Sequence, residues 1–264
     1  MELTFNQIYD YAKCPLIFKF RHMLGIEIPT NLYEQFDKAL IKSILYFYYR
    51  IMDGGTVITS HQLKKRWEAF WGEEDFNPQE FILTPVHGNT PAGGHKNRRP
   101  SAEARRRSFL LRGWSVLNNF HRNNKDNPGT PVAVDLGFTA QLGNHQLSDT
   151  IDLARRIDDK TEIVILNTRQ SPPDDFDIRN DLKTTFQVYG FRNIFNTTED
   201  LITYYYLEKG KKMETVRVQR DFDRMESIID NIVRAIELDI WFPRQTFYCN
   251  TCHFQGMCTQ WEGG

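Results

Sequence analysis

The sequence predicts a single domain of the α/β class, in which a mixed sheet is flanked by helices. Residues 4–124 carry apolar side chains at the spacing of helices, whereas residues 132–168 alternate in the manner of strands. Strands and helices then alternate as far as residue 239. Four cysteines, one near the start of the chain and three near its end, indicate that the two ends meet.

Each expected element rests on its own periodicity and end signals. The expected helices are 4–24, 31–52, 61–71, 101–124, 180–195 and 221–239. The expected strands are 132–141, 146–156, 162–168, 203–208 and 215–220. Proline disfavours helical geometry in the residue before it, so Cys14-Pro15 interrupts the first helix. Ser101 and Asp221 carry side chains suited to cap the helices that they begin.

We expect one domain, 1–264, built from four successive parts. They are the N-terminal cysteine helix (1–30), a helical part (31–125), the α/β core (130–240) and the terminal cysteine motif (241–264). Proline and glycine recur through residues 84–101 and rule out regular structure there. We expect that stretch to be a mobile loop inside the helical part.

Composition excludes few classes of function. Of the 264 residues, 40% are hydrophobic and 25% charged, as in ordinary soluble domains. No apolar run is long enough to span a bilayer, and the first residues lack the basic and apolar regions of a signal peptide. We therefore expect a soluble, cytoplasmic or otherwise intracellular protein without membrane contact. The net charge of −1 gives no indication of a polyanionic partner.

Positive charge is concentrated in one segment. Residues 96–112 hold seven Lys or Arg and one acid, a net charge of +6, which leaves −7 for the rest of the chain. The segment is a candidate for phosphate contacts, although a solvated loop and helix start explains it equally well. The candidate DNA-binding residues are Lys96, Arg98, Arg99, Arg105, Arg106 and Arg107.

The cysteines have the spacing of a metal or cluster site. Cys249, Cys252 and Cys258 follow the pattern C-x2-C-x5-C, and Cys14 is the fourth cysteine. Four thiolates form a closed structural site that suits zinc or an iron–sulfur cluster. Two disulfides are disfavoured by the short spacing and by the expected reducing compartment. Unrelated buried thiols remain an alternative, and spacing does not separate zinc from iron–sulfur.

Several segments together resemble one family. The opening helix with Cys14-Pro15, the strand motif Asp149-Thr-Ile-Asp152, Gln187 and the segment Tyr204–Gly210 are similar to the RecB/AddB-type branch of the PD-(D/E)XK nucleases. Phe242-Pro243 and the terminal cysteines resemble the cluster motif of its CRISPR-associated iron–sulfur exonucleases. The resemblance implies a PD-(D/E)XK nuclease-like mixed sheet with the chain ends joined by a 4Fe–4S cluster. It favours iron–sulfur over zinc.

The resemblance also implies a degenerate catalytic motif. Nucleases of this family use carboxylates to hold Mg²⁺ or Mn²⁺ beside the scissile phosphate, and a lysine orients the attacking water. Asp152 matches the first acid. The second acid is replaced by Leu166, the lysine by Thr168 and the helical histidine by Ile41, with Asp37 in place of a glycine. Weak substitutes nearby are Asp149, Glu162, Asn167 and Arg169.

Three functions follow from these observations. The first is an iron–sulfur protein with a RecB-like nuclease fold and an inactive centre, which serves as a DNA-binding or structural subunit of a larger assembly. The second is an active DNA exonuclease that uses Mg²⁺ or Mn²⁺ and displaced ligands. The third is a scaffold that never touches nucleic acid. Cys14 with the terminal triplet is the expected ligand set, for a 4Fe–4S cluster or, as the alternative, for zinc.

Overall fold

The computed structural model describes residues 2–28, 30–73, 101–169 and 174–263. Apart from Ser101, the loop expected at 84–101 lies outside these residues, and so do Lys96, Arg98 and Arg99. Among the described residues, no helix is both long enough and apolar enough to cross a bilayer.

The centre of the fold is a mixed six-stranded sheet. Its strands are β1 (Glu2–Thr4), β2 (Thr130–Leu142), β3 (His145–Ile157), β4 (Lys160–Asn167), β5 (Leu201–Tyr206) and β6 (Lys211–Thr215). Strands β2 and β3 form a long antiparallel hairpin, and β4 and β6 also pair antiparallel with β3 and β5 respectively. The pairs β1–β3 and β4–β5 are parallel. The mixed sheet expected from the sequence is confirmed.

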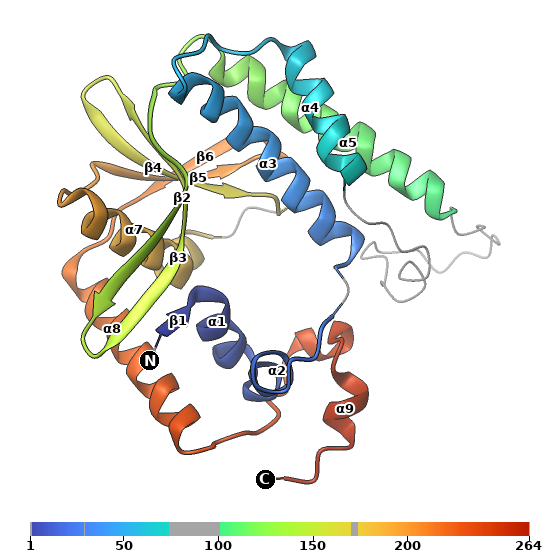
Figure 1. Ribbon diagram of the computed structural model, residues 1–264, viewed down its shortest axis with the longest axis vertical. Helices are drawn as coiled ribbons and strands as arrows, with labels where there is room; N and C mark the ends of the chain where they lie inside the picture. The colour runs from blue at the N-terminus through green and yellow to red at the C-terminus, as the bar shows by residue number, and fades with distance from the viewer. Residues whose placement is uncertain (1, 29, 74–100, 170–173, 264) are drawn as a thin grey trace.

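Helices cover both faces of the sheet (Figure 1). On one face α3 (Leu32–Met52), α4 (Ser60–Glu73) and α5 (Ala102–Asn124) enclose what we call the α3 core. Its buried strand residues are Val134, Leu153, Val164, Leu166 and Tyr205. On the other face α1 (Phe5–Lys13), α7 (Leu182–Phe195) and α8 (Gln219–Glu237) enclose the α7 core. Its buried strand residues include Phe138, Leu147, Ile151, Ala154, Ile163, Ile165 and Tyr204.

The two chain ends lie together at the bottom of Figure 1. Here α1, α2 (Pro15–Phe18) and the π-helix η1 (Lys19–Met23) meet the 3-10 helix η3 (Phe247–Thr251) and α9 (Gln255–Thr259). Tyr11 donates a hydrogen bond to the Ile240 carbonyl at 2.8 Å, and Arg244 donates to the Ala12 carbonyl at 2.6 Å. Trp241 stacks on Phe18. The predicted meeting of the chain ends is therefore confirmed, and it rests on these contacts.

The N-terminal segment differs from the single interrupted helix that we expected. Residues 2–4 form β1, which pairs with β3, and Thr4 then caps α1 through a capping box with Gln7. The helix ends where Cys14 adopts an extended backbone before Pro15, as the proline predicts. Such a short strand carries no periodicity of its own, so only its partner could reveal it.

The strand expected at 215–220 is wrong. Strand β6 ends at Thr215, and α8 begins at Gln219. Between them the buried Arg217 donates to the carbonyls of Ile178 and Asp181 and to the Thr185 hydroxyl, and these bonds hold the segment out of the sheet. Asp221 stabilises the helix start from its third position, where its carboxylate accepts the Val218 N–H at 2.8 Å. The loop expected before 180 contains a short helix, α6 (Asp175–Asn180).

Candidate active site and cysteine site

The strand motif that carries Asp152 lies in a break of the sheet. Strand β2 occupies one edge of β3 along nearly its whole length, so β1 and β4 must share the other edge. Pairing with β1 ends at Ser148, and pairing with β4 begins at Leu153. Among the residues that the structure describes, no strand therefore pairs with 149–152 on that edge. We call this stretch the gap.

Asp135 interrupts the regular strand backbone of β2 opposite the gap. It has a φ of +48°, in the left-handed region that non-glycine residues seldom adopt. It lies between the pairs Leu136–Ile151 and Val134–Leu153, and so opposite Asp152. Ile151 belongs to the α7 core and Leu153 to the α3 core, although residues two apart in a strand normally share a face. The side-chain alternation therefore slips by one residue at Asp152.

The slip directs Asp152 towards α7. The Lys183 ammonium lies 3.9 Å from its carboxylate, and the Gln187 amide is close enough to act on its pKa. Burial raises the pKa of Asp152, and the charge of Asp135 adds to the rise, while Lys183 and Gln187 oppose it. Burial also raises the pKa of Asp149, against the effect of Lys183. Asp149 and Asp152 thus share one basic neighbour.

Some polar atoms beside the gap are buried and poorly hydrogen-bonded. Gln187 is fully buried, and its amide approaches Asp152 closely enough to lower the pKa of that carboxyl, although the contact lacks good hydrogen-bond geometry. One carboxylate oxygen of Asp149 is also buried and unpartnered. Unsatisfied buried groups are uncommon and mark places where a ligand or water is bound, or where strain is stored.

The remaining catalytic positions lie on the other face. Leu166 is 7% exposed and packs in the α3 core, and Ile41 packs against the same core. Thr168 hydrogen-bonds with Asp37, whose pKa is raised to about 6, chiefly by burial. Beside this pair Arg112 binds Glu208 at 2.8 Å. Leu166, which the resemblance aligns with the second acid, has no oxygen that could bind a metal ion.

Two of the possible substitute residues, Glu162 and Asn167, are engaged in other interactions. Glu162 lies at the far end of β4, as expected, and forms a buried ion pair with Arg155 at 2.7 Å. The Asn167 carboxamide accepts the N–H of Arg169 at 2.9 Å. Lys183 was not identified from the sequence. The available signal was its position four residues before Gln187, which places both on one side of a helix.

The four cysteines come from separate segments, and Cys258 lies near enough to the other three for their charges to act on it. Cys14 lies at the break between α1 and α2, Cys249 in η3, Cys252 just after η3 and Cys258 in α9. Burial raises the pKa of the Cys258 thiol, and the charges of the other three cysteines raise it further. Backbone N–H groups of Arg244 and Thr246 lie 3.4 Å from the sulfurs of Cys14 and Cys249. Within the described ranges, no three or more His, Cys, Asp or Glu residues form a group that could hold a metal ion.

The described part of the basic segment serves helix packing at two positions. Arg106 donates to the Trp71 carbonyl at 2.8 Å and lies over the Trp71 ring. Arg112 is paired with Glu208. Arg105 is half-buried and Arg107 exposed. The predicted role of Arg105–Arg107 in DNA binding stays a prediction.

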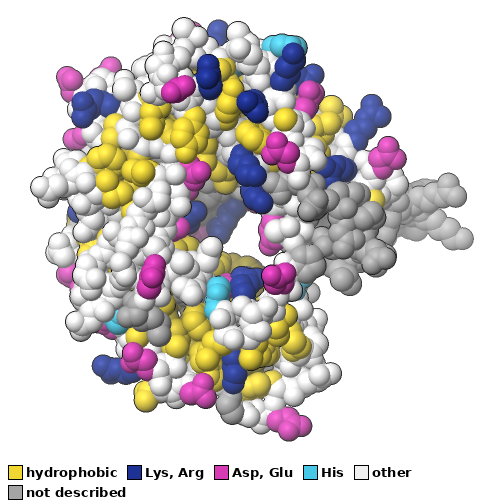
Figure 2. Space-filling model, in the orientation of Figure 1, with side chains coloured by type: hydrophobic (Ala, Val, Ile, Leu, Met, Phe, Trp, Pro, Cys, Tyr) yellow, Lys and Arg dark blue, Asp and Glu magenta, His cyan; other side chains and the backbone are white. Residues whose placement is uncertain are grey.

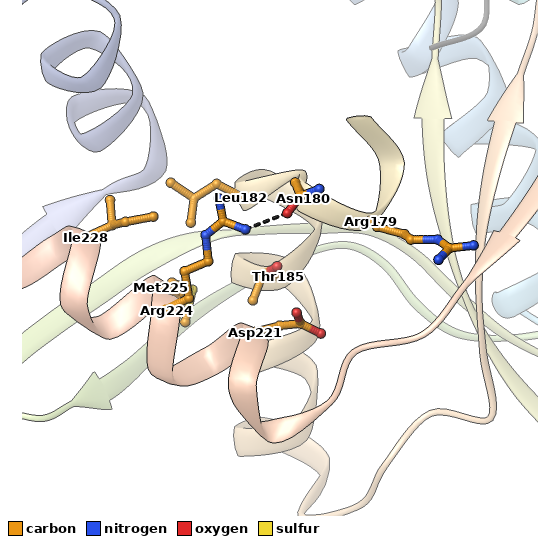
Figure 3. A pocket seen from close by; sticks show the side chains of 8 residues that line it. All are labelled: Arg179, Asn180, Leu182, Thr185, Asp221, Arg224, Met225 and Ile228. Carbon is orange, nitrogen blue, oxygen red and sulfur yellow. Dashed lines mark hydrogen bonds between the residues drawn. The ribbon is translucent and has the colours of Figure 1, made fainter. Parts of the chain in front are cut away.

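The surface is hollowed between the helical part and the chain ends. Figure 2 shows Lys and Arg side chains on the rim of this hollow, together with Asp and Glu. A separate small pocket lies between α6, α7 and α8, where Arg224 donates a hydrogen bond to Asn180 (Figure 3). Its lining includes none of the residues around the gap or the cysteines, so we assign it no role in the site.

Comparisons with known proteins agree with this architecture. The chain is similar in structure to a candidate exonuclease from Eubacterium rectale, with a TM-score of 0.57 at 10% identity, over 98% of this chain and 87% of that one. At this identity the likeness concerns the fold alone. No curated protein matches the sequence. Residues 2–259 match the family model of the PD-(D/E)XK nuclease superfamily, and the chain therefore belongs to that superfamily.

Proposed function

We propose that the protein binds nucleic acid through a nuclease fold that no longer cleaves it, as one subunit of a larger assembly. The observation that carries the proposal is the position of Leu166, buried in the α3 core while Asp152 faces α7. Mg²⁺ and Mn²⁺ require oxygen ligands that converge on one point. A leucine at the second acid position, on the opposite face from the first acid, provides no such convergence.

Three observations support the nucleic-acid part of the proposal. The superfamily is one of nucleases, and a candidate exonuclease shares the fold. Lysine and arginine lie on the rim of the hollow in Figure 2. Lys183 lies at the gap, with a partly exposed side chain that can reach a phosphate. The overall charge of −1 is compatible with local binding, because positive groups act within about 10 Å at ordinary salt.

The second part of the proposal is a 4Fe–4S cluster held by Cys14, Cys249, Cys252 and Cys258. Four thiolates are the usual ligands of such a cluster, and hydrogen bonds to the sulfurs tune it. The N–H groups of Arg244 and Thr246 lie where they can supply such bonds. When bound, the cluster supplies a covalent link between the first and last segments of the chain. Zinc in the same site is the alternative.

A second candidate function is metal-dependent cleavage with displaced ligands. Asp149, Asp152 and Lys183 meet at the gap beside the buried amide of Gln187. In this reading the two aspartates hold Mg²⁺ or Mn²⁺, and Lys183 takes the position of the absent lysine. The scaffold hypothesis, without nucleic-acid contact, is the third outcome of the test below.

The test uses protein purified without oxygen. Iron and zinc analysis with an absorption spectrum identifies the bound metal, and fluorescence anisotropy with labelled DNA at two salt concentrations measures binding. We expect about four irons per chain, affinity that falls as salt rises and no loss of labelled substrate in Mn²⁺. Cleavage that Asp152→Ala abolishes would establish the second candidate. Absence of binding at low salt would leave only the scaffold, and zinc without iron would overturn the cluster.

A further inference from the structure

Two residues next to the cysteines contact each other across the junction of the chain ends. Lys13 precedes Cys14, and Tyr248 precedes Cys249. The Lys13 ammonium lies 4.4 Å from the centre of the Tyr248 ring and 5.9 Å from that of Tyr9. The two tyrosines interact through their side chains. The meeting of Cys14 and Cys249 therefore also assembles a group of two rings and a cation.

Arg169 adds a second cation to this group. It follows β4, whose end points into the gap from one side, while β1 points into it from the other and leads into α1. Burial and Tyr248 raise the pKa of Tyr9, and the charge of Arg169 opposes this rise. The guanidinium therefore acts electrostatically on the same end of the molecule as the Lys13 ammonium.

The two rings of the group are partly open to solvent. Tyr9 is 41% exposed and Tyr248 37% exposed. The acidic neighbour of Tyr9 is Asp10, which is buried and bound by Arg21 at 2.7 Å and by His22 at 2.8 Å. Lys13 and Arg169 are therefore not neutralised by Asp10. Rings beside cations match the alternation of bases and phosphates in a nucleic-acid strand.

We propose that Tyr9, Lys13, Arg169 and Tyr248 form a binding surface for single-stranded nucleic acid, which we call the tyrosine surface. The proposal rests on the nucleic-acid binding proposed above and names the class of strand and its contacts. Bases stack on the two rings, and the cations contact the phosphates. A duplex keeps its base faces stacked inside, so only an unpaired strand can use the rings. The four-cysteine site, in this view, holds the surface together.

The experiment measures the affinity of the full chain for a labelled single-stranded oligonucleotide and for a hairpin duplex of equal length. Tyr9→Ala and Tyr248→Ala are each expected to weaken single-strand binding about tenfold. Tyr9→Phe keeps the ring and should bind like the wild type. Lys13→Gln is expected to lower the salt dependence by about one phosphate contact. Iron content and melting temperature establish that each variant is folded.

Matched controls come from another part of the fold. Tyr46 on α3 lies beneath Arg66, with 4.6 Å between the ring centre and the guanidinium carbon, and Lys64 lies over the Trp114 ring at 5.7 Å. Tyr46→Ala and Lys64→Gln remove a similar ring and cation, so they should change binding less than twofold. A similar loss in these controls and in the tyrosine-surface variants would overturn the proposal.

The outcomes separate this inference from the function on which it rests. If the wild type binds DNA and the alanine variants bind equally well, the tyrosine surface is wrong and nucleic-acid binding stands. If the wild type prefers the duplex, the strand class is wrong. If the wild type binds neither substrate at low salt, the proposed function and this surface fail together.

Discussion

Buried polar side chains are fully hydrogen-bonded at one end of the β3–β4 pair and poorly hydrogen-bonded at the other. At the closed end Arg155 is 1% exposed, and its guanidinium donates to Glu162, to the Tyr48 hydroxyl and to the Pro128 carbonyl. At the open end Asp149 and Gln187 keep buried polar atoms without well-formed hydrogen bonds. Burying a charge costs several kcal/mol unless it is paired and hydrogen-bonded. The closed end therefore holds a fully paired structural charge, whereas the open end leaves buried polar atoms poorly hydrogen-bonded.

The largest expected effect lies at the closed end. Glu162→Ala leaves Arg155 buried without its carboxylate, and we expect a loss of about 3–5 kcal/mol in the free energy of unfolding, measured by urea titration. Glu68→Ala is the control, because it removes an exposed pair with Lys64 at 3.8 Å and should cost about 1 kcal/mol or less. Equal effects of the two substitutions would contradict the structural role of Arg155.

The junction of the chain ends comes next. Cys14→Ser removes one thiolate and with it the proposed link between the first and last segments. We expect loss of the cluster and about 2–4 kcal/mol of stability, by analogy with other cross-links over long loops. Iron analysis and the melting temperature provide the measurement. A variant that keeps both would show that the four-cysteine site is wrong.

A smaller effect concerns Asp37 and pH. Its pKa is raised from 3.8 to about 6 in the fold, so the native state binds a proton more tightly than the unfolded state. Stability should therefore fall as pH rises from about 4 to about 6, by about 1–3 kcal/mol from this group. Asp37→Asn should remove that part of the slope, as measured by urea titrations across this range. An unchanged slope would show that Asp37 titrates normally.

The smallest effect is expected at the open end and has the opposite sign. Gln187→Leu replaces a buried amide, whose contacts lack good hydrogen-bond geometry, by an apolar group of similar size. We expect stability to stay equal or to rise by about 1 kcal/mol. A loss of several kcal/mol on urea titration would mean that the amide is satisfied in solution, and the contrast between the two ends would disappear.

Periodicity predicted most of the fold. The long helices and the hairpin of β2 and β3 carry enough apolar repeats to be identified locally, and Asn31 and Ser101 cap helices that begin where the sequence placed them. Strand β1 was missed because three residues contain no repeat. Strand β6 was misplaced because the Val-Arg-Val segment after it imitates a strand, while the buried bonds of Arg217 decide its course.

The candidate site was predictable only in part. The motif singled out Asp152, which the fold places beside Lys183. Cysteine spacing singled out four thiols, of which three act by charge on Cys258, and their role as one ligand set stays a prediction. The gap arises because β1 and β4 pair with the same edge of β3. No local sequence pattern indicates which strands will share an edge. The positive φ of Asp135 and the approach of Lys183 likewise depend on tertiary packing. The resemblance predicted that Leu166 replaces the second acid, but its burial on the opposite face from Asp152 could not be predicted from the sequence.

In the proposed function, this nuclease fold binds nucleic acid without cleaving it. The most direct measurement incubates anaerobically purified protein with an end-labelled single strand in Mn²⁺, at a concentration where anisotropy shows the strand to be bound. We predict a bound strand of unchanged length, in the wild type and in Asp152→Ala alike. Shortening of the strand by the wild type, lost in Asp152→Ala, would contradict the claim and establish an active site at the gap.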